Sequence, residues 1–136
     1  MTDAHLTEED VLHAANALVE AFRATDTQAY FACFAEDATF VFHTEDRRLG
    51  SRAAYEQLWS TWLDAGWRVT DCSSSDRRVQ LLGDVAVFTH DVRTTTETAG
   101  ESETTRERET IVFRRSDGTI TAVHEHLSPT PHDDRK

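Results

Sequence analysis

Near the end of the chain two histidines flank a glutamate, in the stretch AVHEHLS at residues 122–128. Side chains alternate along a β-strand, so His124 and His126 would share one face and Glu125 would lie on the other. One face then offers two imidazole rings, and the opposite face offers a carboxylate. The strand pattern alone does not decide which face meets a pocket, because both faces carry apolar neighbours of similar size.

A metal site is one interpretation of the histidine pair. His124 and His126 would supply two of the nitrogens that a catalytic zinc requires, with His43 or His90 as the third ligand. This spacing is common in strands, and the sequence fixes no third ligand. We therefore favour hydrogen bonds from the pair to a neighbouring strand or across a subunit interface. The expectation is that no residue is a metal ligand and that the protein needs no cofactor.

Length and charge limit the kind of protein that carries these groups. The chain has 136 residues, 38% hydrophobic and 29% charged, which is typical of one folded domain. A net charge of −11 would repel phosphate backbones and anionic lipids, so we expect no nucleic acid and no membrane as partners. The N-terminal segment lacks the pattern of a signal peptide, which predicts a cytoplasmic protein. Cys33 and Cys72 are expected to be reduced, partly buried thiols.

Three helices are predicted in the first half of the chain. Thr7 can cap the first helix, because it precedes three acidic residues and an apolar stripe with helical spacing. Asp26 can cap a shorter helix over residues 27–35. Ser51 can cap the third helix, which Gly66 ends.

Strand patterns dominate the second half. After a strand at residues 38–43, rich in β-branched and aromatic side chains, four long strands start at Trp67 and are joined by short turns. The Thr- and Glu-rich segment 94–105 is predicted to be an exposed hairpin rather than a flexible insert. Pro129 and Pro131 are expected to end the last strand.

This order of elements predicts an α+β fold, with three N-terminal helices on one face of a cone-shaped, curved antiparallel sheet. We expect residues 1–6 to be a flexible N-terminus, residues 7–128 to be a single domain and residues 129–136 to be a flexible tail.

The segments FAEDATF, SRAAYEQLW and RRSDGTITAVHEHLS resemble the nuclear transport factor 2-like superfamily, and most closely its SnoaL-like and ketosteroid isomerase-like members. The resemblance covers about Thr7 to Ser128 and implies a cystatin-like roll around a conical pocket. The segment ETIVFRRSDGTITAVHEHLS is also similar to the association (hub) domain of calcium/calmodulin-dependent kinase II. That similarity implies that Val123, Glu125 and Leu127 face the pocket and that the two neighbouring histidines face away. The family also implies a homodimer.

The same resemblance places His90 on the inner face, among apolar neighbours. Glu125 would orient His90 for moving a proton next to a carbonyl. Asp26 corresponds to an aspartate that works with a histidine in related dehydratases, although capping alone would also account for it. The catalytic candidates are therefore His90, Glu125 and Asp26. The equally weighted alternative is that His90 and Glu125 only satisfy each other in a pocket that binds.

Apolar side chains would form the wall of this pocket. If Ile111 and Phe113 face inward, the alternation also brings Glu109 to the pocket rim. The expected substrate-binding residues are Tyr30, Phe42, Trp59, Phe88, Val92, Ile111, Phe113, Val123 and Leu127.

Two positions depart from the ketosteroid isomerases that the chain resembles. Where those enzymes carry a carboxylate base this chain has Phe42, and where they carry a protonated acid it has Ile111. The resemblance therefore predicts the fold but not the mechanism.

These observations predict a SnoaL-like protein that binds a small hydrophobic metabolite in a conical pocket. If it is an enzyme, it would be a cofactor-independent acid/base isomerase, dehydratase or cyclase. The alternative is a non-catalytic ligand-binding or oligomerisation module. A metal-dependent enzyme that uses the histidine cluster is the third hypothesis.

Overall fold

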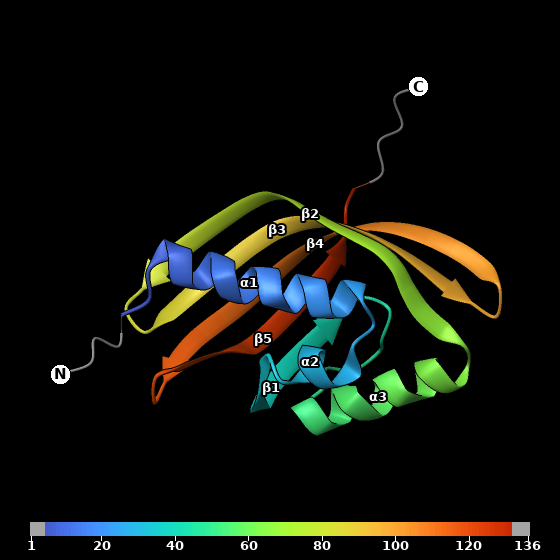
Figure 1. The fold of residues 1–136 in the computed structure, drawn as a ribbon, viewed down its shortest axis with the longest axis horizontal. Helices are drawn as coiled ribbons and strands as arrows, with labels where there is room; N and C mark the ends of the chain where they lie inside the picture. The colour runs from blue at the N-terminus through green and yellow to red at the C-terminus, as the bar shows by residue number, and fades with distance from the viewer. Residues whose placement is uncertain (1–4, 132–136) are drawn as a thin grey trace.

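The computed structural model describes residues 5–131 and has the predicted α+β architecture (Figure 1). Three helices precede the long strands, and one five-stranded sheet organises the molecule. The elements are α1 (Glu8–Arg23), α2 (Thr27–Phe31), β1 (Phe34–Phe42), α3 (Arg52–Asp64), β2 (Trp67–Leu82), β3 (Val85–Thr98), β4 (Glu101–Ser116) and β5 (Thr119–Pro129).

The sheet has the strand order β1-β5-β4-β3-β2. Strands β2 to β5 form the predicted antiparallel meander, and the segment 94–105 is indeed a hairpin of β3 and β4. Strand β1 adds to the free edge of β5 in parallel, which brings Phe40 opposite Glu125 and Phe42 opposite Leu127. The sheet curves over the helices, and α1 lies under its arch (Figure 1).

Helix α1 packs an apolar stripe of Val11, Ala15 and Leu18 against the sheet. Its start is fixed by a capping box: the Asp10 amide donates to Thr7 Oγ1, and the Thr7 amide donates to Asp10 Oδ2, both at 3.1 Å. The expected cap at Thr7 is therefore confirmed, as are those at Asp26 and Ser51.

Helix α2 is shorter than predicted. It ends at Phe31 rather than continuing to residue 35, and β1 begins already at Phe34. The Cys33 carbonyl accepts a hydrogen bond from the Ala122 amide at 2.8 Å, so the chain joins β5 here. Backbone pairing with a strand that lies far away in the sequence overrides the local helical pattern.

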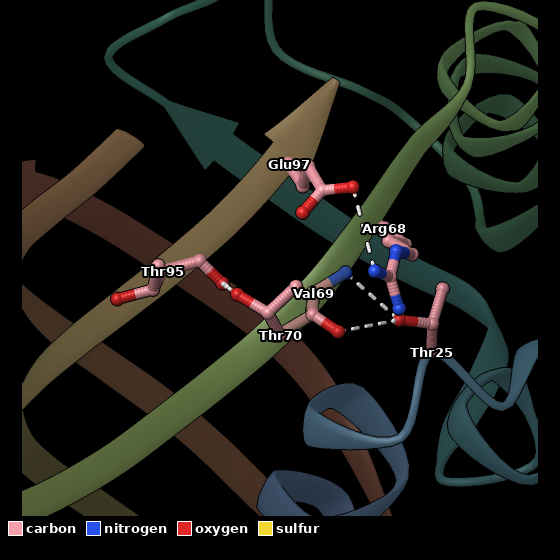
Figure 2. Close-up of polar contacts among 6 residues, drawn as sticks. All are labelled: Thr25, Arg68, Val69, Thr70, Thr95 and Glu97. Carbon is pink, nitrogen blue, oxygen red and sulfur yellow. Dashed lines mark hydrogen bonds and ion pairs between the residues drawn. The ribbon is translucent and has the colours of Figure 1, made fainter. Parts of the chain in front are cut away.

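A β-bulge fastens the helical layer to the sheet (Figure 2). Thr70 is an extra residue between the pairs Val69–Thr96 and Asp71–Thr95. The Thr25 hydroxyl, in the turn after α1, accepts from the Val69 amide at 2.9 Å and donates to the Val69 carbonyl at 3.3 Å. Thr25 has a φ of 52°, which is unfavourable for a β-branched residue, and these bonds hold it there.

The core beneath the helices is mainly aromatic. Trp59 of α3 is almost fully buried, stacks on Tyr30 with ring centroids 5.0 Å apart, and donates its indole N–H to Thr27 Oγ1 at 2.9 Å. Burial of a side chain of this size contributes about 3–5 kcal/mol to stability. This packing fixes the helices against the sheet and so defines the space that they enclose.

Backbone contacts extend to both ends of the described chain. Leu6 is only 4% exposed and its amide donates to the Gly83 carbonyl at 2.8 Å, so the packed chain begins before Thr7. At the other end β5 continues to Pro129, and the Thr130 amide donates to the Arg106 carbonyl. The remaining positions of the two expected flexible segments, residues 1–4 and 132–136, lie outside the described residues. No helix in the described part is long and apolar enough to cross a membrane.

Candidate functional site

A cavity of about 300 Å³ lies between the helices and the inner face of the sheet. Its inner end, here called the floor, consists of the buried residues Tyr30, Tyr55, His90 and Glu125, together with Glu109, which contacts His90. Its exposed end, here called the mouth, includes the exposed Glu103. Helix α1, the aromatic residues of α3 and the inner faces of β2 to β5 complete the wall.

Strand β4 runs from the mouth to below the floor. Three of its inward residues mark this course: Glu103 is exposed, Glu107 is 8% exposed and Ile111 is fully buried. Glu109 lies between the last two and also lines the cavity. A single strand face thus carries carboxylates from solvent to the core.

His90 is held by two polar neighbours. Its Nε2 lies 2.7 Å from Glu109 Oε1, and its Nδ1 lies 2.6 Å from Ser74 Oγ. A carboxylate only accepts, so Nε2 carries the proton in this contact. The His90 side chain is fully buried, and His90 and Glu109 are directly paired across β3 and β4. Because both ring nitrogens are occupied, His90 orients Glu109 rather than presenting a free nitrogen to the cavity.

Glu125 lines the floor and is 2% exposed. Burial raises the pKa of its carboxyl group well above the ordinary value, the negative charge of Glu109 and a hydrogen bond with that side chain raise this pKa further, and a hydrogen bond with the Tyr30 hydroxyl acts in the opposite direction. Glu125 therefore keeps its proton at pH values at which an ordinary glutamate releases it. Its Oε2 is buried and has no hydrogen-bond partner among the described residues.

Two tyrosine hydroxyls lie beside this acid. Tyr30 and Tyr55 are hydrogen-bonded through their hydroxyls at 3.0 Å. Burial, followed for both by the nearby Glu125, raises the pKa of each phenol well above its ordinary value, so both remain protonated. The floor therefore combines the O–H groups of two tyrosines and Glu125 with the carboxyl group of Glu109.

A second histidine–glutamate pair lies nearer the mouth. His43 Nε2 is 2.5 Å from Glu107 Oε2, and the His43 side chain is 32% exposed. Glu107 lines the cavity, as do Glu45 and Glu103.

Neither cysteine is an activated nucleophile. Cys72 lines the cavity, and burial raises the pKa of its thiol to about 11 despite the nearby Thr94 hydroxyl. Burial also raises the pKa of Cys33. Both are free thiols, Cys72 buried and Cys33 partly buried, in agreement with the expectation.

The structure brings only some of the predicted site residues to the cavity. His90 and Glu125 line it, but the carboxylate bonded to His90 is Glu109 and not Glu125 as proposed. Asp26 does not line it; its side chain accepts from the Ala29 amide at 3.2 Å, which is the capping role alone.

Of the residues predicted to form the wall, some line the cavity and others lie in the core. Tyr30, Phe42, Val92 and Leu127 line the cavity. Four others are buried in the core without reaching the cavity, because they sit one packing layer beyond its lining: Trp59, Phe88, Ile111 and Phe113.

Val123 is not an inward residue. The pairing shifts between Val112–His124 and Phe113–Ala122, so Val123 is the extra residue of a β-bulge, and Ala122 takes the buried position. Alternation of inward and outward side chains therefore holds from Glu125 to Leu127, but the bulge interrupts it between Glu125 and Ala122.

The hydrogen bond to a neighbouring strand that was favoured for the histidine pair is present for His124, and for His126 that role stays a prediction. His124 faces away from the cavity and its Nδ1 lies 2.7 Å from Thr39 Oγ1 on the neighbouring strand, while His126 is exposed. Partial burial lowers the pKa of His124, and His126 adds to this effect. Within residues 5–131 there is no group of three or more His, Cys, Asp or Glu side chains placed to hold a metal ion.

Glu109 is the functional residue whose contact the sequence reasoning missed. Alternation with Ile111 and Phe113 had placed it at the rim, which is correct in direction. The pairing of His90 with Glu109 depends on the register of β3 against β4, and a sequence pattern does not contain that register.

Comparison with known proteins identifies the family and the fold. The SnoaL-like domain family matches residues 11–132. A ketosteroid isomerase-like protein from Erwinia carotovora atroseptica is 18% identical with a TM-score of 0.78, covering 93% of this chain and 100% of that one. A nuclear transport factor 2-like protein from Cytophaga hutchinsonii is 14% identical with a TM-score of 0.78, covering 92% and 100%.

A putative calcium/calmodulin-dependent protein kinase II association domain from Xanthomonas campestris is 21% identical with a TM-score of 0.76, covering 94% of this chain and 91% of that one. No curated protein matches the sequence. At these identities the structural likeness shows the fold alone. The family match extends over nearly the whole described chain, and the protein therefore belongs to the SnoaL-like domain family.

Proposed function

We propose that this protein is a cofactor-independent acid/base enzyme that moves a proton on a small, largely apolar molecule, as in an isomerisation, dehydration or cyclisation. One observation carries the proposal: the neutral acid Glu125, with an unpartnered buried oxygen, lies in the cavity beside the carboxylate of Glu109. A proton donor and a proton acceptor on one floor are what such a reaction needs.

The two carboxyl groups have complementary roles. Glu109 accepts a proton from the carbon next to a substrate carbonyl, while the O–H of Glu125 donates a hydrogen bond to the carbonyl oxygen as negative charge develops there. Return of the proton to another carbon completes an isomerisation without net gain or loss of protons. The apolar wall keeps water from competing for these groups.

His90 is a positioning residue in this scheme. Its N–H holds Glu109 in one orientation, and Ser74 fixes the imidazole from the other side. Such support reduces the reorganisation that proton transfer would otherwise require.

The test is hydrogen–deuterium exchange on an enolisable probe. The protein is incubated with 2-tetralone in D₂O, and loss of the signals of hydrogens next to the carbonyl is followed by NMR. Wild-type protein should accelerate exchange, and Glu109→Gln should reduce the acceleration by roughly 10²–10⁴-fold. Glu101→Gln changes a charge on the same strand outside the cavity and is expected to leave exchange unchanged.

Binding of 2-tetralone without acceleration of exchange would contradict the enzyme proposal and support a non-catalytic binding module. The homodimer and the cytoplasmic location stay predictions, and light scattering after size-exclusion chromatography would measure the oligomeric state.

A further inference from the structure

We infer that the ligand of this cavity carries a positively charged amine, which lies at the mouth while its apolar body reaches the floor. This inference rests on the proposed function in that it uses the same cavity, but it names the chemical class of the ligand.

The first reason is the charge of the lining residues. Five glutamates line the cavity, and no lysine or arginine among residues 5–131 does; the glutamates are Glu45, Glu103, Glu107, Glu109 and Glu125. Inward residues two apart on a strand are about 7 Å apart, so the β4 carboxylates repel one another in a partly dry space. A cation bound between them would remove this repulsion.

The protein itself compensates only the deeper acids. Glu107 contacts His43 and Glu109 contacts His90. Glu103 and Glu45 form no ion pair with another described residue. The uncompensated negative charge is therefore concentrated towards the mouth.

Glu125, at the floor of the cavity, gives an independent reason to expect a ligand. Glu125 Oε2 is buried in the floor without a hydrogen-bond partner. Buried polar atoms are nearly always satisfied, so this atom marks where a polar group of a ligand would be met. The cavity thus has a polar contact at the floor and negative charge at the mouth.

Two indole rings line the cavity at the same end as Glu103. Trp62 and Trp67 are half-buried, line the cavity and have ring centroids 5.1 Å apart at 52° to each other. Thr96 pairs with Val69 on one side and with Glu103 on the other, so the start of β2, where Trp67 lies, is at the same end as Glu103. Indole rings at the end of the cavity that carries a carboxylate are favourable for an ammonium group, through cation–π attraction.

Other ligand classes fit these residues less well. A phosphate or carboxylate ligand would meet only negative charge. A metal ion would need a converging set of ligands, and the described residues offer none. A purely neutral ligand would leave the mouth carboxylates uncompensated.

The experiment compares three probes of similar shape by calorimetry and by quenching of tryptophan fluorescence. The cation is benzyltrimethylammonium, its neutral isostere is neopentylbenzene and the anion is phenylacetate. The cation should bind at least tenfold more tightly than the isostere, and phenylacetate should bind more weakly than either. Raising the salt concentration from 50 to 500 mM should weaken binding of the cation only.

Substitutions in the cavity test which residues bind the cation. The double variant Glu103→Gln with Glu107→Gln should lower affinity for the cation about tenfold and leave affinity for neopentylbenzene unchanged. Glu101→Gln makes the same charge change on β4 outside the cavity and should alter neither. Trp67→Leu should lower the affinity for the cation more than the affinity for neopentylbenzene.

Equal affinity for the cation and its isostere, or tighter binding of phenylacetate, would overturn the inference. The exchange of 2-tetralone does not depend on a charged ligand, so that result leaves the proposed function standing. Selective binding of the cation without acceleration of exchange would support the inferred ligand class and contradict the proposed function.

Discussion

Two histidine–glutamate pairs each contribute a glutamate to the wall of one cavity, at different depths. His90 with Glu109 is at the floor, with the imidazole fully buried and its second nitrogen on Ser74. His43 with Glu107 is nearer the mouth, with the imidazole 32% exposed. Water screens the outer imidazole and is excluded from the inner one, so the two pairs should differ in energetic weight and in chemistry.

The largest effect on stability is expected from His90→Ala. The substitution leaves a cavity and removes the partner of Glu109 and of Ser74, at a cost of about 3 kcal/mol in the free energy of unfolding. Urea unfolding followed by circular dichroism measures this loss. A loss below about 1 kcal/mol would show that the inner pair is no more tightly coupled than the outer one.

His90→Ala also tests the positioning role. If His90 orients Glu109, exchange of 2-tetralone per folded molecule should fall, with the loss in kcat rather than in KM. A purely structural histidine would lower only the folded fraction.

The second-largest effect is expected to be a dependence of the free energy of unfolding on pH, caused by Glu125. The folded protein keeps the Glu125 proton above pH 4.5, the ordinary value for a glutamate, whereas the unfolded chain releases it. Unfolding therefore becomes easier as pH rises, by about 1.4 kcal/mol per pH unit until the pH reaches the folded-state pKa. Glu125→Gln lacks this proton equilibrium, so its stability relative to wild type should increase from pH 5 to pH 7.

Urea unfolding of both proteins at pH 5, 6 and 7 measures the difference. A constant difference between them would mean that Glu125 is ionised in the folded protein, which would remove the proposed acid.

The smallest effect is expected for His43→Ala. A partly exposed pair contributes up to about 1 kcal/mol, and salt should reduce that contribution. Measurements at 50 and 500 mM NaCl should therefore bring the variant and wild type closer together. A loss as large as that of His90→Ala, unaffected by salt, would contradict the difference between the two pairs.

Local patterns were enough to predict most elements. The caps at Thr7, Asp26 and Ser51 and the hairpin over residues 94–105 depend on neighbouring residues, and the structure confirms them. The predicted helix over residues 27–35 was too long, because Cys33 is paired with Ala122 of β5. Propensity does not contain a contact between residues so far apart in the chain.

The pattern of the chain predicted the α+β order of elements, and the family resemblance predicted that His90 and Glu125 face inward; alternation with Ile111 and Phe113 then placed Glu109 on the same side. Which carboxylate meets His90 emerged only in the packed sheet, because strand register depends on long-range pairing. The packed sheet also places Val123 in a β-bulge, so its side chain does not join the inward-facing residues of β5. Burial in the same sheet raises the pKa of Glu125. Burial and register are properties of the packed sheet, and no stretch of the chain specifies them alone.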